Sequence, residues 1–261
     1  MKFAVLGSNA SKSLSPRLHS FIYKLINLKH SYSYIESNMI DSAVLSDYDG
    51  LNITNPFKNN IIKYLDQLDP IALKTQSVNC IKIIDEVKYG YNTDYYGFKK
   101  SMELNNINFS NRDILVLGAG GVSNTICRYL SDKECNFKII NRTHKNSKIL
   151  LKRLNLSENN MVQPSSSDSL EYDTIINCIS SEIDMENYFN SISLDSNHIH
   201  TYIDMNYNFK NDFIKNSSVH KVIDGLDMLI FQAIKSIEIW MENNILQGVD
   251  YKKIREHIME N

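Results

Sequence analysis

An amine and a carboxylate stand out in the first hundred residues because short polar motifs surround them. Lys58 ends the motif N-I-T-N-P-F-K, and Asp94 ends the motif N-T-D. The other polar members are Ser13, Ser15, Thr54, Asn79, Asn92 and Thr93. Such a set offers many directed hydrogen bonds and few formal charges, which suits a small polyhydroxylated carboxylic acid. Taken alone, each motif could also be a turn or a helix cap, as Ser15 before Pro16 would be.

A second set of residues fits a phosphate group. The loop Gly118-Ala119-Gly120-Gly121-Val122-Ser123 lies between the apolar run 114–117 and a helical pattern over 122–130. A tight turn there would aim backbone N–H groups and a helix N-terminus at a pyrophosphate. Ser123 stands where the usual fingerprint has its third glycine, so an ordinary strand-to-helix turn is the alternative. We predict a dinucleotide site.

The segment Asn141-Arg142-Thr143 follows the next predicted strand and indicates which dinucleotide would bind. An NAD-binding unit would normally place Asp or Glu here to hold the ribose 2′-hydroxyl. An arginine instead can bind a 2′-phosphate through two parallel hydrogen bonds. We therefore predict NADP as the cofactor, with a solvated surface charge as the alternative role of Arg142.

The elements that must position these residues alternate between strand and helix patterns, which predicts an α/β fold. The predicted strands are 2–6, 32–35, 50–54, 77–84, 87–91, 114–117, 137–140, 174–177 and 202–204. One predicted helix begins at Pro16. The other predicted helices cover 95–104, 122–130, 146–154, 226–243 and 251–259. The Ser-rich stretch 161–168 is expected to be a surface loop. A polar stretch near residue 105 indicates a domain boundary.

Charge and composition exclude several classes of protein. The 28 basic and 30 acidic residues nearly balance, with no run of five like charges, so no nucleic-acid partner is predicted. No apolar stretch approaches the ~18 residues of a membrane span, and the apolar N-terminal run is too short for a signal peptide. The four cysteines lie far apart without a C-x-x-C pair, so neither a metal site nor disulfides are predicted. A cytoplasmic protein is expected.

Taken together, the motifs resemble the shikimate dehydrogenase family. The resemblance is carried by S-x-S-P-x-x-H over 13–19, G-L-N-I-T-N-P-F-K over 50–58, G-Y-N-T-D-x-x-G-F over 90–98, the glycine loop, N-R-T over 141–143 and G-L-D-M-L-x-x-Q-A over 225–233. It runs in order from Gly7 to about Trp240 and includes every glycine except Gly248. It implies reversible, NADP-dependent reduction of 3-dehydroshikimate to shikimate in aromatic amino-acid biosynthesis, by a monomer or a homodimer.

The same resemblance implies roles for individual residues. Lys58 would be the acid in reduction and the base in the reverse direction, and Asp94 would orient it. The substrate carboxylate would bind Ser13 and Ser15, with help from Tyr207, and the ring hydroxyls would bind Thr54, Asn79 and Gln232. The cofactor would contact Gly118, Ala119, Gly120, Gly121, Val122, Asn141, Arg142, Thr143, Gly225 and Met228.

The implied architecture has two domains. Residues 1–105 would form an α/β substrate-binding and catalytic domain, and 106–226 a Rossmann-like NADP-binding domain. Because Gln232 would reach the substrate from the long helix after residue 226, residues 227–261 are expected to pack back on the first domain.

The sequence departs from the family pattern at three places. Gln76-Ser77 stand where the family usually has glycine and alanine, Cys178-Ile179-Ser180-Ser181-Glu182 replace Ala-Thr-Ser-x-Gly, and Phe209 replaces a proline. The catalytic set is intact, and the departures bear on the backbone around the cofactor.

Three alternative functions remain. An NAD-dependent quinate/shikimate dehydrogenase is disfavoured by Arg142. A non-catalytic sensor of shikimate or nucleotide has no need of both Lys58 and Asp94. An enzyme like methylene-tetrahydrofolate dehydrogenase shares two domains and a catalytic lysine, but it predicts neither the serine pair nor the motif N-T-D.

Overall fold

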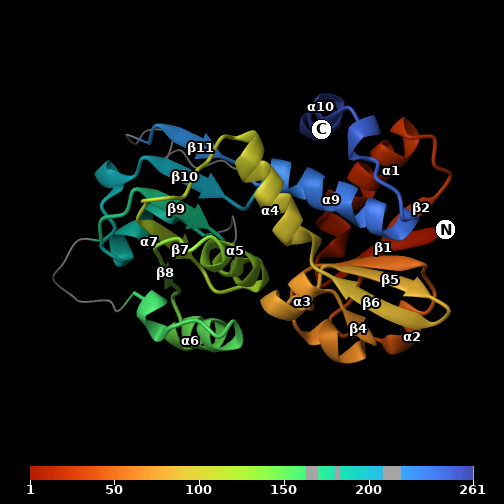
Figure 1. Ribbon diagram of the computed structural model, residues 1–261, viewed down its shortest axis with the longest axis horizontal. Helices are drawn as coiled ribbons and strands as arrows, with labels where there is room; N and C mark the ends of the chain where they lie inside the picture. The colour runs from red at the N-terminus through yellow and green to blue at the C-terminus, as the bar shows by residue number, and fades with distance from the viewer. Residues whose placement is uncertain (163–169, 180–182, 208–218, 261) are drawn as a thin grey trace. The chain divides into compact units, whose positions relative to one another are not determined.

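The computed structural model describes residues 1–162, 170–179, 183–207 and 219–260. The chain divides into two compact units (Figure 1). Unit 1 consists of Met1–Ser101 and Asp227–Asn261, and unit 2 consists of Met102–Leu226. Both ends of the chain therefore build unit 1, while unit 2 is a single continuous segment.

Unit 1 is built on a six-stranded mixed sheet with the order β2-β1-β3-β5-β6-β4. The strands are β1 (Lys2–Gly7), β2 (Ser31–Glu36), β3 (Gly50–Ile53), β4 (Gln67–Leu68), β5 (Cys80–Ile84) and β6 (Val87–Tyr91). β1 is parallel to β2 and β3, whereas β5 is antiparallel to both β3 and β6. The β5–β6 hairpin turns at Asp85-Glu86, which both adopt the positive φ that such two-residue turns require.

The helices of unit 1 cover both faces of this sheet. They are α1 (Ser15–Leu25), α2 (Ser42–Leu45), α3 (Pro70–Thr75), α4 (Thr93–Leu104, which continues past the end of the unit), α9 (Leu226–Met241) and α10 (Tyr251–Met259), with the 3-10 turns η1 (Ala10–Lys12), η2 (Asn60–Tyr64) and η5 (Leu246–Gly248). Side chains alternate along a strand, so Ala4 and Leu6 face one core while Phe3 faces the other. On that second face, Trp240 of α9 stacks on Phe3 at 4.4 Å and donates to the Ile81 carbonyl at 2.8 Å.

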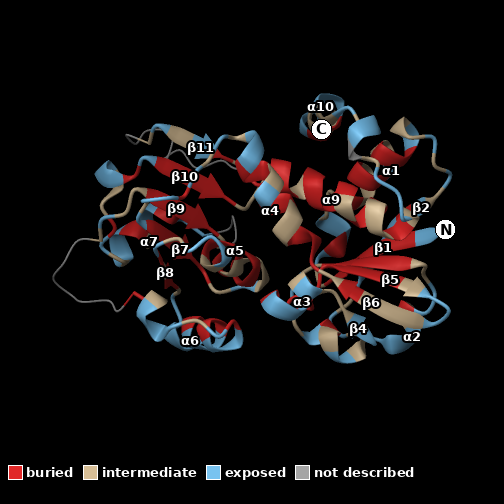
Figure 2. Cartoon of the chain, viewed as in Figure 1, coloured by how far each residue is buried: buried red, intermediate tan, exposed pale blue. Residues whose placement is uncertain are grey.

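Unit 2 is built on a five-stranded sheet with the order β11-β10-β9-β7-β8, and every pairing is parallel. The strands are β7 (Ile114–Leu117), β8 (Phe137–Ile140), β9 (Thr174–Asn177), β10 (Thr201–Asp204) and β11 (Lys221–Ile223). The helices are α5 (Gly121–Asp132), α6 (His144–Arg153) and α7 (Met185–Ser191), with the 3-10 turns η3 (Glu158–Asn160) and η4 (Ser196–His198). β7, β9 and β10 are buried throughout, as expected of strands covered on both faces (Figure 2).

Two local predictions were wrong, over 77–84 and over 161–162, and the structure also excludes the alternative role of Ser15 as a helix N-cap. The strand expected over 77–84 begins only at Cys80. Ser15 is the first residue of α1 and not its N-cap; its N–H donates to the Ser13 hydroxyl at 3.1 Å instead. Met161 and Val162 are buried, and the Val162 N–H donates to the Ile139 carbonyl at 3.0 Å, so they are not surface loop. The rest of that predicted loop, from residue 163 to 168, lies outside the described residues.

Candidate active site

The candidate active site of unit 1 lies at one edge of its sheet. β1 and β3 are parallel and end there, and the segments with Ser13, Thr54 and Lys58 follow them. β5 runs antiparallel to β3, so Asn79, just before β5, lies at the same edge. β6 reverses direction again and delivers Asp94 in the first turn of α4. The topology thus gathers motifs that are up to eighty residues apart in the sequence.

Lys58 and Asp94 form an ion pair. Lys58 Nζ donates to Asp94 Oδ2 at 2.7 Å, and the two side chains are 12% and 7% exposed. The loop that carries Lys58 is tied at both ends. The Phe57 N–H donates to the Thr54 carbonyl at 3.0 Å, and the Val78 N–H donates to the Lys58 carbonyl at 2.8 Å. A poorly hydrated ammonium is therefore held against one carboxylate oxygen.

The side-chain amide of Asn79 organises the other polar groups. Its nitrogen lies 2.9 Å from Asp94 Oδ1, 2.9 Å from Thr93 Oγ1 and 3.3 Å from Gln232 Oε1, while its oxygen accepts the Thr93 N–H at 2.7 Å. An amide nitrogen carries only two hydrogens, so these three acceptors compete. Gln232, at the longest distance, is the acceptor most easily released to another donor.

The predicted carboxylate-binding residues lie after β1. Ser15 is buried, and Ser13 is half-buried with its hydroxyl accepting the Ser15 N–H at 3.1 Å. Thr54 follows β3 and donates its N–H to the Leu6 carbonyl at 2.9 Å. Gly7 makes this close approach possible, because a Cβ at that position would overlap the Thr54 side chain.

In unit 2 the glycine loop has the geometry of a phosphate-binding turn. Gly118 has a φ of +96°, a left-handed conformation that favours glycine. No atom lies within 4 Å of where a Cβ of Gly120 would stand, and the Gly120 N–H donates to the Ser123 hydroxyl at 3.2 Å. α5 begins at Gly121, so its free N–H groups point out of this open turn.

The remaining predicted cofactor residues of unit 2 follow neighbouring strands of the same parallel sheet. Asn141 comes directly after β8 and donates its side-chain amide to the Thr143 carbonyl at 3.0 Å, while Arg142 is exposed. Because β7 and β8 are parallel, this segment and the glycine loop lie at the same edge. Gly225 follows β11, and a Cβ there would lie 3.2 Å from the Met205 Cα. Tyr207 follows β10 and is half-buried.

Of the departures from the family pattern, the structure describes Gln76-Ser77 and, from the second, Cys178 and Ile179. Gln76 ends α3 with a φ of 49°, the left-handed region in which glycine is favoured, and its side-chain nitrogen donates to the Leu73 carbonyl at 2.7 Å. The Cys178 carbonyl carbon lies 3.3 Å from a Cβ at Gly118, and burial raises the pKa of the Cys178 thiol to about 12. Ser180, Ser181 and Phe209 lie outside the described residues.

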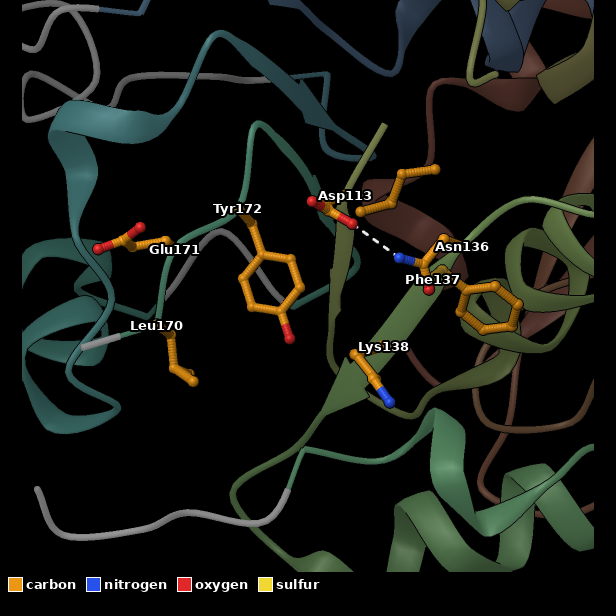
Figure 3. A pocket seen from close by; sticks show the side chains of 8 residues that line it. Asp113, Asn136, Phe137, Lys138, Leu170, Glu171 and Tyr172 are labelled. Carbon is orange, nitrogen blue, oxygen red and sulfur yellow. Dashed lines mark hydrogen bonds between the residues drawn. The ribbon is translucent and has the colours of Figure 1, made fainter. Parts of the chain in front are cut away.

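Unit 2 also contains a cavity of about 270 Å³ (Figure 3). Its wall includes Asp113, just before β7, and Asn136, just before β8, whose side-chain amide donates to Asp113 at 2.7 Å. Lys138 and Tyr172 also line it. The cavity lies at the amino ends of β7 and β8, whereas the glycine loop lies at their carboxyl ends, so the cavity is separate from the predicted dinucleotide site.

A buried set of polar residues beside the Lys58–Asp94 pair was not predicted from the sequence. Asn52 of β3, Ser236 of α9 and Tyr32 of β2 are at most 9% exposed and hydrogen-bond with one another or with Asn79. Asn52 belongs to the motif that ends at Lys58, and this was the available signal. Over the described residues, no group of three His, Cys, Asp or Glu side chains could hold a metal ion.

The chain is similar to known proteins over most of its length. Residues 5–81 match the shikimate dehydrogenase substrate binding domain, and residues 100–191 match the shikimate / quinate 5-dehydrogenase family. The chain is 31% identical over 250 residues to a shikimate dehydrogenase (NADP(+)) of Clostridium perfringens, covering 91% of each chain. It is 32% identical over 257 residues to the protein of that name from Nitrosopumilus maritimus, covering 91% of this chain and 92% of the relative.

Solved structures confirm the predicted two-domain α/β fold. The shikimate dehydrogenase of Aquifex aeolicus has a TM-score of 0.83 at 27% identity, covering 100% of this chain and 98% of that one. The shikimate 5-dehydrogenase of Thermus thermophilus, solved in complex with NADP(H) and shikimate, has a TM-score of 0.82 at 23% identity, covering 100% and 99%.

Proposed function

Because this chain belongs to the shikimate dehydrogenase family, we propose that it catalyses the reversible, NADP-dependent reduction of 3-dehydroshikimate to shikimate. The observation that carries the proposal is the Lys58–Asp94 ion pair, at 2.7 Å, with Asn79 and Gln232 beside it. A cation next to hydroxyl-binding amides is what reduction of a ketone in a polyhydroxylated ring requires.

Lys58 is the proton donor in this proposal. NADPH, when bound, supplies the hydride that adds to the ketone carbon. As the carbonyl bond becomes a single bond, Lys58 Nζ gives one proton to the oxygen, which becomes the hydroxyl of shikimate. In the reverse direction the neutral amine takes that proton back. Asp94 keeps Nζ in place, both while it carries the proton as an ammonium and after it has become a neutral amine.

The polar groups around the pair would bind the substrate. Ser13 and Ser15 would hold its carboxylate, with Tyr207 as a further donor, and Thr54 and Asn79 would hold ring hydroxyls. Gln232 Oε1 would accept a ring hydroxyl in exchange for its long contact with Asn79. This exchange keeps a hydrogen-bond donor on Gln232 Oε1.

The described residues of unit 2 fit an NADP molecule. The open space at Gly120 and the N-terminus of α5 suit a pyrophosphate, with Gly118, Ala119, Gly121 and Val122 forming the turn. Arg142 would bind the 2′-phosphate beside Asn141 and Thr143. Gly225 and Met228 would border the nicotinamide.

The proposed reaction places the protein in aromatic amino-acid biosynthesis, in the cytoplasm, as a monomer or a homodimer. Among the helices of the described residues, none is long and apolar enough to cross a bilayer.

A turnover assay tests the proposal. Purified protein receives shikimate with either NADP or NAD, and the absorbance of the reduced cofactor is followed. We expect turnover with NADP and much less with NAD. Faster turnover of quinate with NAD would instead indicate the quinate/shikimate alternative. Absence of turnover with either cofactor, by protein shown to be folded, would contradict the enzyme proposal and favour a sensor.

A further inference from the structure

A buried chain of hydrogen bonds leads from β2 to the Lys58–Asp94 pair. The Tyr32 hydroxyl donates to Asn52 Oδ1 at 2.7 Å. The Asn52 amide nitrogen donates to the Asn79 carbonyl at 3.1 Å and to Ser236 Oγ at 2.9 Å. Asn52 lies on the face of β3 that α9 covers, opposite its apolar neighbours Leu51 and Ile53. Two strands, the residue just before β5 and one helix are therefore joined by the side-chain amide of Asn52.

The number of hydrogens that each group can donate fixes the direction of these hydrogen bonds. A backbone carbonyl can only accept, so the nitrogen of Asn52 must face Asn79 and its oxygen must face Tyr32. The single hydrogen of Ser236 goes to the Gln232 carbonyl at 2.9 Å. Ser236 Oγ then accepts from Asn52, and towards the Thr93 hydroxyl, 3.2 Å away, it can act only as an acceptor.

These hydrogen bonds make the Thr93 hydroxyl a donor on one side and an acceptor on the other. Its hydroxyl hydrogen points away from Asn79, towards Ser236 or Gln232, so its lone pair faces the Asn79 amide and accepts from it. With one hydrogen of Asn79 on Thr93, the other is aimed at Asp94 Oδ1, which lies 2.9 Å away. The carboxylate orientation, and with it the position of Lys58 Nζ, depends on hydrogen bonds that begin at Asn52.

We propose that Asn52 is a positioning residue of the dehydrogenase reaction. It holds the Asn79 backbone directly and Thr93 through Ser236, and these two residues aim Asp94 at Lys58. Asn52 itself is 5% exposed and has all its hydrogen-bonding groups used inside the protein, so it touches neither substrate nor cofactor. The inference rests on the proposed function and deepens it.

The test compares Asn52→Ala with a matched control, Ser77→Ala. Ser77 is as buried as Asn52, lies in the same unit and carries a hydroxyl that makes no hydrogen bond within the described part of the chain. The only tryptophan of the sequence, Trp240, is buried and 6.2 Å from the Tyr32 ring, so its emission reports the folded fraction of each variant. Ser236→Ala removes only the path that runs from Asn52 through Ser236 to Thr93. It is the further variant if Asn52→Ala does not fold.

For Asn52→Ala we expect kcat per folded molecule to fall about tenfold to a hundredfold, the effect of a small misplacement of reacting groups. The KM for 3-dehydroshikimate should change much less. Two further readouts distinguish positioning from a loss of folded protein. The deuterium isotope effect on kcat should rise as hydride transfer becomes slower than product release, and the kcat–pH profile should shift because the Lys58–Asp94 geometry changes.

Either of two results would overturn the inference. One is activity per folded molecule equal to that of Ser77→Ala. The other is a lower kcat with an unchanged isotope effect and pH profile, which indicates a structural role alone. If the unmodified protein shows no turnover, the proposed function fails first and this inference fails with it. Turnover by the unmodified protein with no response to Asn52→Ala or Ser236→Ala rejects only the inference.

Discussion

Lys58 carries the most specific expectation at the scale of single residues. Lys58→Ala should lower kcat by about 10²–10⁴-fold, because it removes the proton donor, with little change in KM. Steady-state kinetics in both directions would measure this. Lys63→Ala, an exposed lysine of η2, is the control and should leave both constants unchanged. A change in KM alone would make Lys58 a substrate-binding residue and not the proton donor.

Arg142 is expected to decide between the two dinucleotides. A charge-assisted hydrogen bond contributes about 1.5–3 kcal/mol, so Arg142→Glu should raise the KM for NADP by roughly tenfold to a hundredfold. The KM for NAD, which lacks the phosphate, should stay the same or fall. The comparison needs kinetics with both cofactors, with Arg153→Glu at the exposed end of α6 as the control. Equal effects on NADP and NAD would show that Arg142 does not contact the 2′-phosphate.

At the scale of elements, α4 and α9 approach closely at Gly97. A Cβ there would lie 2.6 Å from the Met228 carbonyl and 3.0 Å from Gln232 Cβ. Gly97→Ala should therefore destabilise the protein by about 1–3 kcal/mol through overpacking and displace Gln232. Urea unfolding followed by Trp240 emission measures the loss of stability, and the KM for shikimate should rise.

Gly248 is the control position for the unfolding measurement on Gly97→Ala. It is the glycine outside the family motifs, and nothing lies within 4 Å of its Cβ position. Gly248→Ala should leave stability unchanged or raise it slightly, since alanine restricts the unfolded chain. Equal losses for both substitutions would mean that the α4–α9 contact is looser than the structure indicates.

The long elements could be predicted from sequence because their patterns are local. The motif after β3, the hairpin at Asp85-Glu86 and α10 needed no knowledge of distant residues. The short elements α2, α3 and β4 were missed, because they are held by packing on the sheet and lack a long periodic pattern. Lys58 and Asp94 were predicted only through their motifs, and their contact depends on the reversal of β5 and β6.

The hydrogen bonds behind the site were beyond prediction. Asn52 and Ser236 are 184 positions apart, and their bond crosses from a strand at the start of the chain to a helix near its end. In the sequence of α9, Ser236 is one small polar residue on an apolar face, and this pattern predicts no particular role for it. Its role becomes visible only when α9 is placed on β3.

At the scale of the whole molecule, His19 should make stability depend on pH. Its ring is fully buried and stacks on Tyr32 at 4.0 Å, and neither ring nitrogen has a hydrogen-bond partner among the described residues. Burial lowers the pKa of His19 from 6.5 to about 3. Between these values the unfolded chain binds a proton that the folded chain does not, so stability should fall as the pH is lowered from 6.5 towards 3.

The measurement is urea unfolding at several pH values for the protein and for His19→Phe. The wild-type stability should fall by up to about 1.4 kcal/mol more per pH unit than that of the variant within this window, and the two slopes should agree above it. Comparing slopes removes the contribution of the carboxylates, which both proteins share. Parallel slopes throughout would show that His19 reaches solvent and titrates normally in the folded protein.

Because unit 1 is built from both ends of the chain, it cannot be completed until translation has ended. The strands of unit 1 leave the ribosome first, but α9, whose Trp240 stacks on Phe3, and α10, whose His257 stacks on Phe21 at 3.8 Å, are translated last. At about 5–20 residues per second, β1 to β6 must wait many seconds before α9 can complete the cover of that face. Unit 2 is complete before then. The domain that begins the chain is therefore the last to finish folding, and during that wait it is the part of the nascent chain that most needs a chaperone.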